Sequence, residues 1–270
     1  MKLRIFCNTI KYYRIIDKLP KYVIPLGLGN AKFPAHWLTE KSGKNIIQLN
    51  KYYGEATGIY WIWKNYLNNL SSEDFIGFCQ YRRLWLDGLY FNKQKSNSAS
   101  LYSKLLKEDN EILENTETVL LQPLILKNEN LFEQFEKIYG KNILGNCIQI
   151  LPEEDREDFL KFLKGNKLSI CNMFITKTKI FEKYCQSMFV WIDKCYEYCK
   201  KENLLNGTSI RLPIFIIERY TSYWFEKYSK CDYLSFARLG ENFLSNNINY
   251  FINPLKFPFT FRQYPTIHRF

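Results

Sequence analysis

The tract Phe75-Ile-Gly-Phe-Cys-Gln-Tyr-Arg-Arg83 joins a short apolar strand to a strongly polar end. The guanidinium groups of two adjacent arginines, Arg82 and Arg83, can bind a diphosphate through paired hydrogen bonds to its oxygens. In the other interpretation, one arginine is solvated and the other pairs with a structural carboxylate. The tract therefore predicts either an anion-binding site or a structural ion pair at the end of a buried strand.

A second group of candidate residues lies in an aromatic-rich stretch whose apolar spacing of three and four residues predicts a helix over about 46–69. The apolar stripe is expected in the core, whereas Glu55 and Lys64 lie off the stripe. Gly54 and Gly58 each cost a helix about 1 kcal/mol relative to alanine. We therefore expect another part of the backbone to approach this stretch closely.

Polar residues also interrupt two later apolar segments. Asn172 lies in a predicted strand over 169–176, and the pair Glu218-Arg219 lies in a predicted helix over 214–228. A charged pair among apolar residues is either a buried structural ion pair or a carboxylate held for acid–base chemistry. Both interpretations remain open from the sequence.

The elements that must position these residues alternate between short apolar strands and helical patterns. This alternation predicts an α/β fold with an open, mostly parallel sheet and helices on both faces. Ligands of such sheets bind beyond the carboxyl ends of the strands. Strands are expected at 3–7, 22–26, 75–79, 118–126, 169–176 and 232–236, and helices at 46–69, 152–165, 179–200 and 214–228. We expect one domain over 1–245, with a loop at 84–100, and a tail at 246–270 packed on the domain.

Composition and charge limit the classes of protein to which this chain can belong. The 270 residues carry a net charge of +11, which favours phosphate-bearing substrates or an anionic membrane surface. The basic residues are dispersed without a nucleic-acid-binding motif, so RNA binding is supported by charge alone. The longest apolar runs are far shorter than the roughly 20 residues of a membrane span, and the first eight residues are typical of a strand, not a secretion signal. The eight cysteines lie mostly in apolar segments, as expected of reduced thiols in a cytoplasmic protein.

Taken together, the motifs resemble a bacterial family of capsular and exopolysaccharide glycosyltransferases. That family has a Glu-Leu-Thr…Tyr-Trp…Trp-Lys-Asn helix followed by His-Tyr-Arg-Arg-Tyr-Phe, an Asn-Met-Phe-Ile strand and a late Glu-Arg helix. The matching residues here are Gly43-Lys-Asn-Ile46, Asn50, Tyr52, Glu55, Thr57, Tyr60-Trp61, Trp63-Lys64-Asn65, Ile76-Gly77, Tyr81-Arg82-Arg83, Asn172-Met-Phe-Ile175 and Glu218-Arg219. Ala56, Gln80 and Leu84-Trp85 depart from the family pattern. The resemblance spans roughly residues 3–236, and the motifs occur in the same order.

The resemblance implies a nucleotide-diphosphosugar transferase of the GT-A type that works on cell-surface polysaccharide. The expected donor is a nucleotide sugar, UDP-linked foremost, with a furanose such as galactofuranose among the candidates. The expected acceptor is a glycan or lipid-linked glycan of a capsule, lipooligosaccharide or O-antigen. Such acceptors grow at the inner membrane face, where positive charge would favour peripheral docking. The family histidine is Gln80 here, so a role that needs an imidazole does not carry over.

Sugar transfer requires charge neutralisation on the leaving diphosphate and, for inversion, a base for the acceptor hydroxyl. The chain has no Asp-x-Asp that would hold a divalent metal such as Mg²⁺ or Mn²⁺. We therefore expect Arg82 and Arg83 to supply part of that charge, with Gln80 and Tyr81 beside the diphosphate. No metal ligand is assigned, and metal dependence stays open.

The remaining roles follow from the matched motifs. Glu218 is expected to be the base, with Glu55 as the second candidate. Substrate-binding residues are expected at Asn172, Arg219, Trp61, Lys64 and Asn50. The alternative is a non-catalytic carbohydrate- or phosphate-binding module, which would explain the arginines and aromatics but not the charged pair in an apolar helix.

Overall fold

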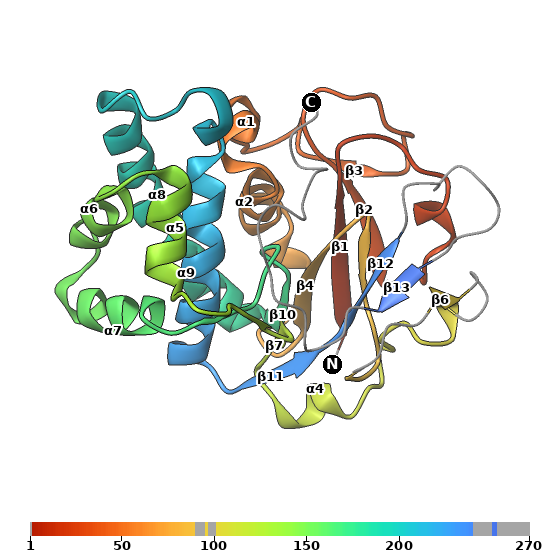
Figure 1. The fold of residues 1–270 in the computed structure, drawn as a ribbon. Coiled ribbons are helices and arrows are strands. Elements are labelled where there is room, and N and C mark those ends of the chain that lie inside the picture. Colours follow the sequence, from red (N-terminus) through yellow and green to blue (C-terminus); the bar gives the residue numbers. More distant parts are fainter. Residues whose placement is uncertain (1, 90–94, 97–100, 240–249, 253–270) are drawn as a thin grey trace.

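The structure is a computed structural model of the chain and describes residues 2–89, 95–96, 101–239 and 250–252. Its centre is a sheet in which every strand of the central region except β10 runs in the same direction (Figure 1). The spatial order of this region is β3 (Leu38–Thr39), β2 (Val23–Gly27), β1 (Leu3–Thr9), β4 (Phe75–Gln80), β10 (Phe174–Lys177), β7 (Thr118–Leu121) and β11 (Cys231–Leu234). The prediction of a mostly parallel α/β sheet is thus confirmed.

Short antiparallel strands extend the sheet from the end of β4. They are β5 (Arg83–Trp85), β12 (Phe236–Leu239), β13 (Tyr250–Ile252) and β6 (Lys95–Ser96), and β8 (Leu124–Ile125) pairs separately with β9 (Lys167–Leu168). The turn between β4 and β5 is tight, with Gln80 paired to Arg83. The polar end of the predicted tract is therefore a hairpin turn at the edge where the parallel strands end.

The helices gather mainly at one side of the sheet, and α1 and α2 lie between the helical group and the first strands (Figure 1). Their bounds are α1 (Asn50–Tyr53), α2 (Ala56–Asn65), α4 (Ile112–Asn115), α5 (Leu131–Tyr139), α6 (Ile143–Gln149), α7 (Glu153–Leu163), α8 (Thr178–Lys201) and α9 (Leu212–Tyr228). Single 3-10 turns occur at Ile16–Lys18, Ile47–Leu49, Leu67–Asn69 and Gly207–Ser209. No helix among the residues described here is both long and apolar enough to cross a lipid bilayer.

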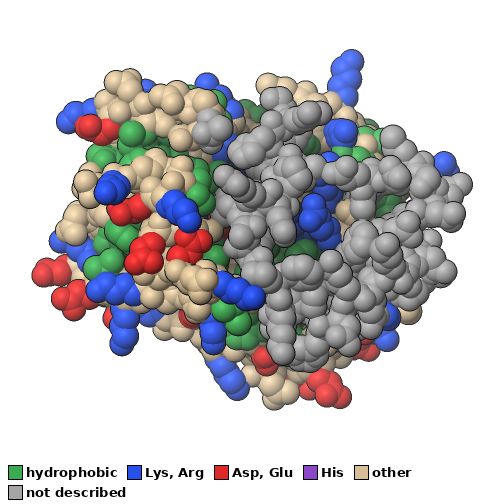
Figure 2. All heavy atoms as spheres, viewed as in Figure 1, with side chains coloured by type: hydrophobic (Ala, Val, Ile, Leu, Met, Phe, Trp, Pro, Cys, Tyr) green, Lys and Arg blue, Asp and Glu red, His purple; other side chains and the backbone are tan. Residues whose placement is uncertain are grey.

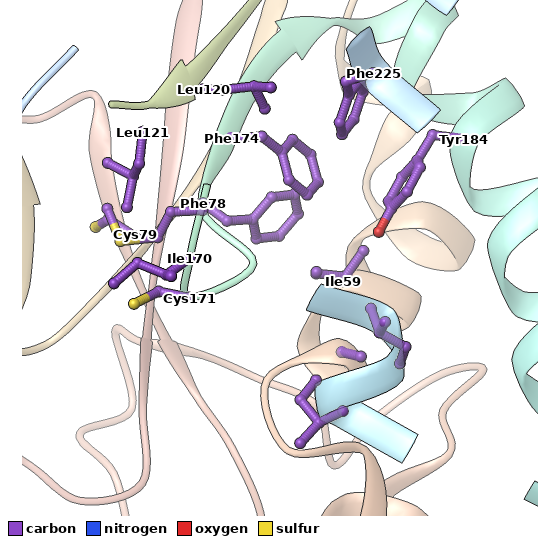
Figure 3. Close-up of a cluster of buried hydrophobic side chains, with 14 of the residues drawn as sticks. Ile59, Phe78, Cys79, Leu120, Leu121, Ile170, Cys171, Phe174, Tyr184 and Phe225 are labelled. Atoms are coloured by element: carbon purple, nitrogen blue, oxygen red, sulfur yellow. The ribbon is translucent and has the colours of Figure 1, made fainter. Parts of the chain in front are cut away.

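Aromatic packing fixes α9 to the middle of the sheet. Figure 3 shows Phe78 of β4 and Phe174 of β10 leading toward Tyr184 of α8 and Phe225 of α9. The ring centroids of Phe78 and Phe174 are 5.2 Å apart, and those of Phe174 and Phe225 are 4.7 Å apart. All four side chains are buried, and the hydroxyls of Tyr184 and Thr221 lie 2.7 Å apart, so the tyrosine's polar end is satisfied. The helix that carries Glu218 is therefore held firmly against the strand that carries Gln80.

Two predicted elements are interrupted by residues with positive φ. The helix expected over 46–69 breaks at Gly54, whose φ of +50° ends α1 before α2 begins. The strand expected over 169–176 starts only at Phe174, because Cys171 and Asn172 form a left-handed turn with φ of +74° and +47°. Both corrections have the same cause, since a left-handed residue turns the chain out of helix and strand alike.

Other predicted bounds need smaller changes. The strand expected over 118–126 is two strands, β7 and β8, because Pro123 between them cannot donate a ladder hydrogen bond. Within the loop predicted at 84–100, Leu84 and Trp85 belong to β5 and residues 95–96 to β6, while 90–94 and 97–100 lie outside the described residues. Of the predicted tail at 246–270, only β13 is described, and the division at residue 245 stays a prediction.

Candidate active site

A cavity of about 1080 Å³ lies beyond the carboxyl ends of β1 and β4, where the sheet topology predicts a ligand site. It is large enough for a drug-sized ligand or more. Among its lining residues are Asn8 and Thr9 from β1, the turn Gln80–Arg83, Asn50, Gly54 and Glu55 from the α1–α2 region, Ile170–Asn172, and Arg211 and Glu218 from the α9 region. Most of the residues singled out in the sequence are thus brought together at one cavity.

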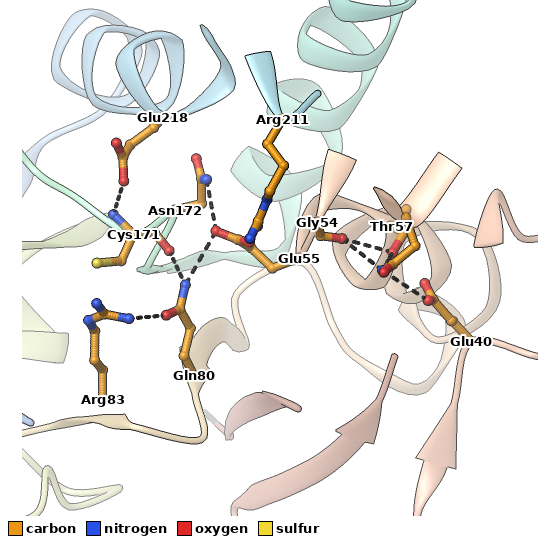
Figure 4. A network of polar contacts seen from close by, with 11 residues as sticks. Glu40, Gly54, Glu55, Thr57, Gln80, Arg83, Cys171, Asn172, Arg211 and Glu218 are labelled. Carbon is orange, nitrogen blue, oxygen red and sulfur yellow. Dashed lines mark hydrogen bonds and ion pairs between the residues drawn. The ribbon is translucent and has the colours of Figure 1, made fainter. Parts of the chain in front are cut away.

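Glu55, at the start of α2, is the most heavily bonded carboxylate of the cavity. Its Oε1 accepts hydrogen bonds from Gln80 Nε2 (3.3 Å) and Asn172 Nδ2 (3.1 Å). Its Oε2 lies 3.5 Å from Arg211 Nη2, and the Glu55 side chain is only 14% exposed. Figure 4 shows Glu55 between these three partners. A carboxylate whose two oxygens are both engaged by neighbouring donors is suited to orienting those neighbours.

Gln80 connects Glu55 to the arginine pair. Its Nε2 also donates to the carbonyl of Cys171 at 2.9 Å, and its Oε1 accepts from Arg83 Nη1 at 2.5 Å. An amide offers both a donor and an acceptor, as a neutral imidazole does. Gln80 can therefore perform the hydrogen bonding that a histidine would perform at this position, with Arg83 held toward the cavity.

Glu218 reaches the same network from α9 with fewer partners. Its Oε1 accepts a 2.5 Å hydrogen bond from the backbone N–H of Cys171. Burial raises the pKa of Glu218, and the bond from Cys171 and the charge of Arg219 offset part of that rise. A cavity carboxyl with a raised pKa is suited to accept a proton near neutral pH. The two carboxyl groups thus differ: neighbouring donors engage both oxygens of Glu55, whereas Glu218 has fewer partners and a raised pKa.

Arg82 and Tyr81 complete the turn. Arg82 lines the cavity with its guanidinium carbon 5.1 Å from the ring centroid of Tyr81. Tyr81 in turn stacks on Tyr13 at 4.8 Å, and burial raises its pKa, so its phenol is neutral at physiological pH. The carbonyl of Arg82 accepts from the N–H of Leu239 at 2.8 Å. Stacking and pairing to β12 therefore fix this turn.

Three predicted substrate-binding residues do not line the cavity. Arg219 is fully buried, donates to Gln134 Oε1 (2.5 Å) and the Phe215 carbonyl (3.0 Å), and serves the core. Trp61 donates its indole N–H to the Ser42 carbonyl at 2.6 Å. Lys64 is exposed, with its Nζ 3.1 Å from the Trp63 ring centroid. These placements do not support the predicted contacts with substrate, and Glu218 and Arg219 have separate hydrogen-bond partners.

Asn50 does line the cavity, and it is supported by a buried carboxylate that the sequence reasoning missed. Asn50 Nδ2 donates to Thr57 Oγ1 (2.9 Å), to the Gly54 carbonyl (3.2 Å) and to Glu40 Oε1 (3.4 Å). Glu40 is fully buried, accepts from the Gly29 N–H at 2.6 Å, and has its pKa raised by burial. Its sequence context is a polar loop, which gives no signal of burial.

Arg211 is the second residue that the sequence reasoning missed. It directly precedes α9 and contributes to the cavity with Arg238 of β12 and two lysines, Lys11 and Lys51. Among the described lining residues, six basic side chains face two carboxylates, an excess of four positive charges. A cavity of this composition favours anionic ligands.

The described residues contain no group of three His, Cys, Asp or Glu side chains placed to hold a metal ion. On the protein surface, by contrast, charge is mixed: Lys and Arg alternate with Asp and Glu over the helical half at the left of Figure 2. On the face in view, charges of both signs are therefore mixed over the helices, whereas the lining of the cavity has an excess of positive charge.

The fold of the chain matches that of a solved protein structure. A solved structure titled "WbbM bifunctional glycosyltransferase apo structure" matches with a TM-score of 0.69 at 19% sequence identity, over 87% of this chain and 45% of that chain. The chain therefore shares the fold of part of that protein, and it spans less than half of that protein's length. No curated protein matches.

Residues 4–230 match the model of a family described as a domain of unknown function, DUF4422. The chain belongs to this family. The match covers all the motifs that resemble the capsular glycosyltransferases, from the first strand to the Glu218-Arg219 helix. The specific signature of that resemblance stays a prediction.

Proposed function

We propose that the chain is a glycosyltransferase that moves a sugar from a nucleotide-diphosphate donor to a hydroxyl group of a growing surface glycan. The observation that carries this proposal is the placing of Arg83 and Glu218 on one cavity, linked through Gln80 and the peptide unit of Cys171. The two requirements of sugar transfer, an anion site and a base, are thus met by neighbouring groups.

The donor diphosphate binds at the turn after β4 in this proposal. Arg82 and Arg83 face it, and Gln80 fixes the direction of the Arg83 guanidinium. Fixed donors directed at developing negative charge stabilise the departing nucleoside diphosphate without reorganisation. The Arg238 side chain, from the strand paired with β5, adds charge at the same end of the cavity.

Glu218 acts as the base. The acceptor hydroxyl oxygen forms a bond to the anomeric carbon while its proton passes to Glu218, and the bond from that carbon to the diphosphate oxygen breaks. The electron pair leaves with the nucleoside diphosphate, and direct displacement inverts the anomeric carbon. Glu55 is the weaker candidate, because Gln80, Asn172 and Arg211 already occupy its oxygens.

The finer assignments rest on the family resemblance and on charge. We propose a UDP-linked donor, with galactofuranose as one candidate sugar, and an acceptor that belongs to a capsule, lipooligosaccharide or O-antigen. The net charge of +11 would favour a cytoplasmic location at the inner membrane face, where lipid-linked acceptors are anionic.

Release of nucleotide tests the proposal. The protein is incubated with UDP-, GDP- and CMP-sugars and a surface-glycan acceptor, with and without a chelator, and nucleoside diphosphate or monophosphate is measured. Release that depends on acceptor and falls in Glu218→Gln supports the proposal, and loss with chelator would reveal a metal requirement. Tight donor binding with no release under any condition would favour the non-catalytic binding module instead.

A further inference from the structure

The turn Cys171–Asn172 lies between the two halves of the proposed reaction site. Both residues have positive φ, at +74° and +47°, a conformation that costs a residue other than glycine roughly 1 kcal/mol or more. Cys171 has neither the small size of glycine nor the locally bonding side chain of asparagine. Its conformation therefore requires support from the surrounding fold.

That support comes through the peptide groups of Cys171, each of which bonds a side chain of the site. The Cys171 N–H donates to Glu218 Oε1 at 2.5 Å, and the Cys171 carbonyl accepts from Gln80 Nε2 at 2.9 Å. Gln80 holds Arg83 at 2.5 Å. Cys171 thus contacts both Gln80, which holds Arg83 of the proposed diphosphate site, and Glu218, the proposed base (Figure 4).

Asn172 anchors the turn from the other side. Its Nδ2 donates to Glu55 at 3.1 Å, and its Oδ1 accepts from Thr221 Oγ1 at 3.2 Å, one helical turn from Glu218 on α9. Asn172 is buried, and so is the Cys171 side chain. The turn is therefore tied to α2, β4 and α9 at the same time.

We propose that Cys171 is a positioning residue whose left-handed backbone, through its N–H and its carbonyl, sets the position and hydrogen bonding of Glu218 relative to Arg83. This inference rests on the proposed function of Glu218. The part that matters is the backbone, since burial raises the pKa of the Cys171 thiol to about 12 and keeps it protonated. A left-handed residue here directs its N–H toward α9 and its carbonyl toward β4; an extended residue would not.

The groups around Glu218 determine whether loss of the Cys171 hydrogen bond raises or lowers its pKa. Burial raises its pKa, and the Cys171 N–H, Arg219 and Arg83 lower it. The negative charge of Glu55 raises it further, and the Tyr139 phenol, whose pKa is raised by burial, faces it as a neutral group. Removal of the Cys171 N–H bond must therefore raise the pKa of Glu218.

The test compares Cys171→Gly with Cys171→Val in the full chain. Glycine adopts positive φ freely and keeps both peptide contacts, whereas a β-branched side chain disfavours this conformation. The readout is the titration of the Glu218 carboxyl carbon by NMR, assigned with Glu218→Gln, which needs no enzymatic activity. The glycine variant should titrate as the wild type does, and the valine variant should titrate about one pH unit higher.

Transfer rates provide the second readout. The acid limb of kcat/KM should move to higher pH in Cys171→Val and stay in place in Cys171→Gly. The proposal would be overturned if Glu218 titrated alike in a folded valine variant and in the wild type. A glycine variant in which Glu218 titrates as it does in the valine variant would overturn it too. If the valine variant does not fold, Cys171→Thr replaces it, because threonine is also β-branched but has a smaller apolar surface. Absence of transfer by the wild type would refute the proposed function and leave the titration result intact.

Discussion

Arg211 occupies the space that a side chain on Gly54 would need: a Cβ on Gly54 would lie 2.5 Å from Arg211 Nη2. The same nitrogen is the one that lies 3.5 Å from Glu55 Oε2. The break between α1 and α2 therefore does two things, since it ends one helix and admits the arginine that contacts the next residue, Glu55. The expected approach of another backbone segment is wrong at this glycine, because the group that comes close is the Arg211 side chain.

Gly54→Ala is expected to displace Arg211 and lower transfer. The variant combines an unfavourable positive φ with a collision, so a loss of about 1–3 kcal/mol in the free energy of unfolding is expected. Urea denaturation and the KM for each substrate measure the two effects. Gly140→Ala is the control, because Gly140 also has positive φ (+115°), is not among the residues that line the cavity, and a Cβ added there would meet only the end of the Ile143 side chain at 3.2 Å. Equal transfer in both variants would contradict the role of Arg211.

Glu218→Gln is expected to lower kcat by about 10²–10⁴-fold and to leave donor affinity nearly unchanged. The folded-state pKa of Glu218 is raised above its ordinary value, so the group loses its proton only at a higher pH than an exposed glutamate. The wild-type rate should accordingly rise with pH through that raised pKa. The variant should lack this limb, and an unchanged kcat would exclude Glu218 as the base.

Arg82→Ala with Arg83→Ala is expected to raise the donor KM and lower kcat by about tenfold or more each, because each lost charge-assisted hydrogen bond contributes roughly 1.5–3 kcal/mol. Steady-state kinetics with a saturating acceptor measure both constants. Lys64→Ala removes an exposed charge outside the cavity and serves as the control for net charge. Undiminished transfer by the double variant would refute the diphosphate site.

Variants of Gln80 test whether this position needs only hydrogen bonding or the acid–base chemistry of an imidazole. Gln80→His should keep at least roughly a tenth of the activity, because a neutral imidazole can replace one donor and one acceptor. Gln80→Leu should lose far more, since Arg83 and the Cys171 carbonyl lose their shared partner. Parallel donor titrations of the two variants make the comparison. Wild-type activity in the leucine variant would show that the network is dispensable.

Arg219 is expected to act on stability alone. Arg219→Ala leaves a void and an unpaired Gln134 amide in the core, so a loss of about 3–5 kcal/mol in the free energy of unfolding is expected. Combining Arg219→Met with Gln134→Leu removes both polar partners and should recover part of that loss. Denaturant unfolding measures the change, and the donor KM of the folded fraction should stay at the wild-type value. A raised donor KM would restore the substrate-binding role that the sequence predicts for Arg219.

The sequence is sufficient for the parts of the site that a local pattern marks. Gln80–Arg83 can be placed because an apolar strand runs directly into them, and Glu218 because a charge stands out in an apolar helix. The sheet class follows from the same alternation of strands and helices. These signals are local, so one chain segment is enough to reveal each of them.

The rest depends on contacts between distant segments. Nothing near Cys171 indicates a left-handed conformation, because its φ is imposed by Gln80 and Glu218. Arg211 has no local motif, and its position is decided by the space at Gly54. Arg219 is predicted to bind substrate because it belongs to the Glu-Arg pair that resembles the family motif, although successive helical residues point about 100° apart.

The late position of the Cys171–Asn172 turn and of α9 in the chain has a consequence for the order in which the protein is made. The Cys171–Asn172 turn precedes β10, and α9 follows it, so Arg83 and Glu55 leave the ribosome long before the groups that bind Gln80 and carry Glu218. Strands β1 and β4 can pair early, but a nascent chain that stops short of α9 holds the Arg82–Arg83 turn and lacks both Glu218 and Arg238. The ability to transfer sugar would thus be acquired last in synthesis, when the final third of the domain folds onto the first.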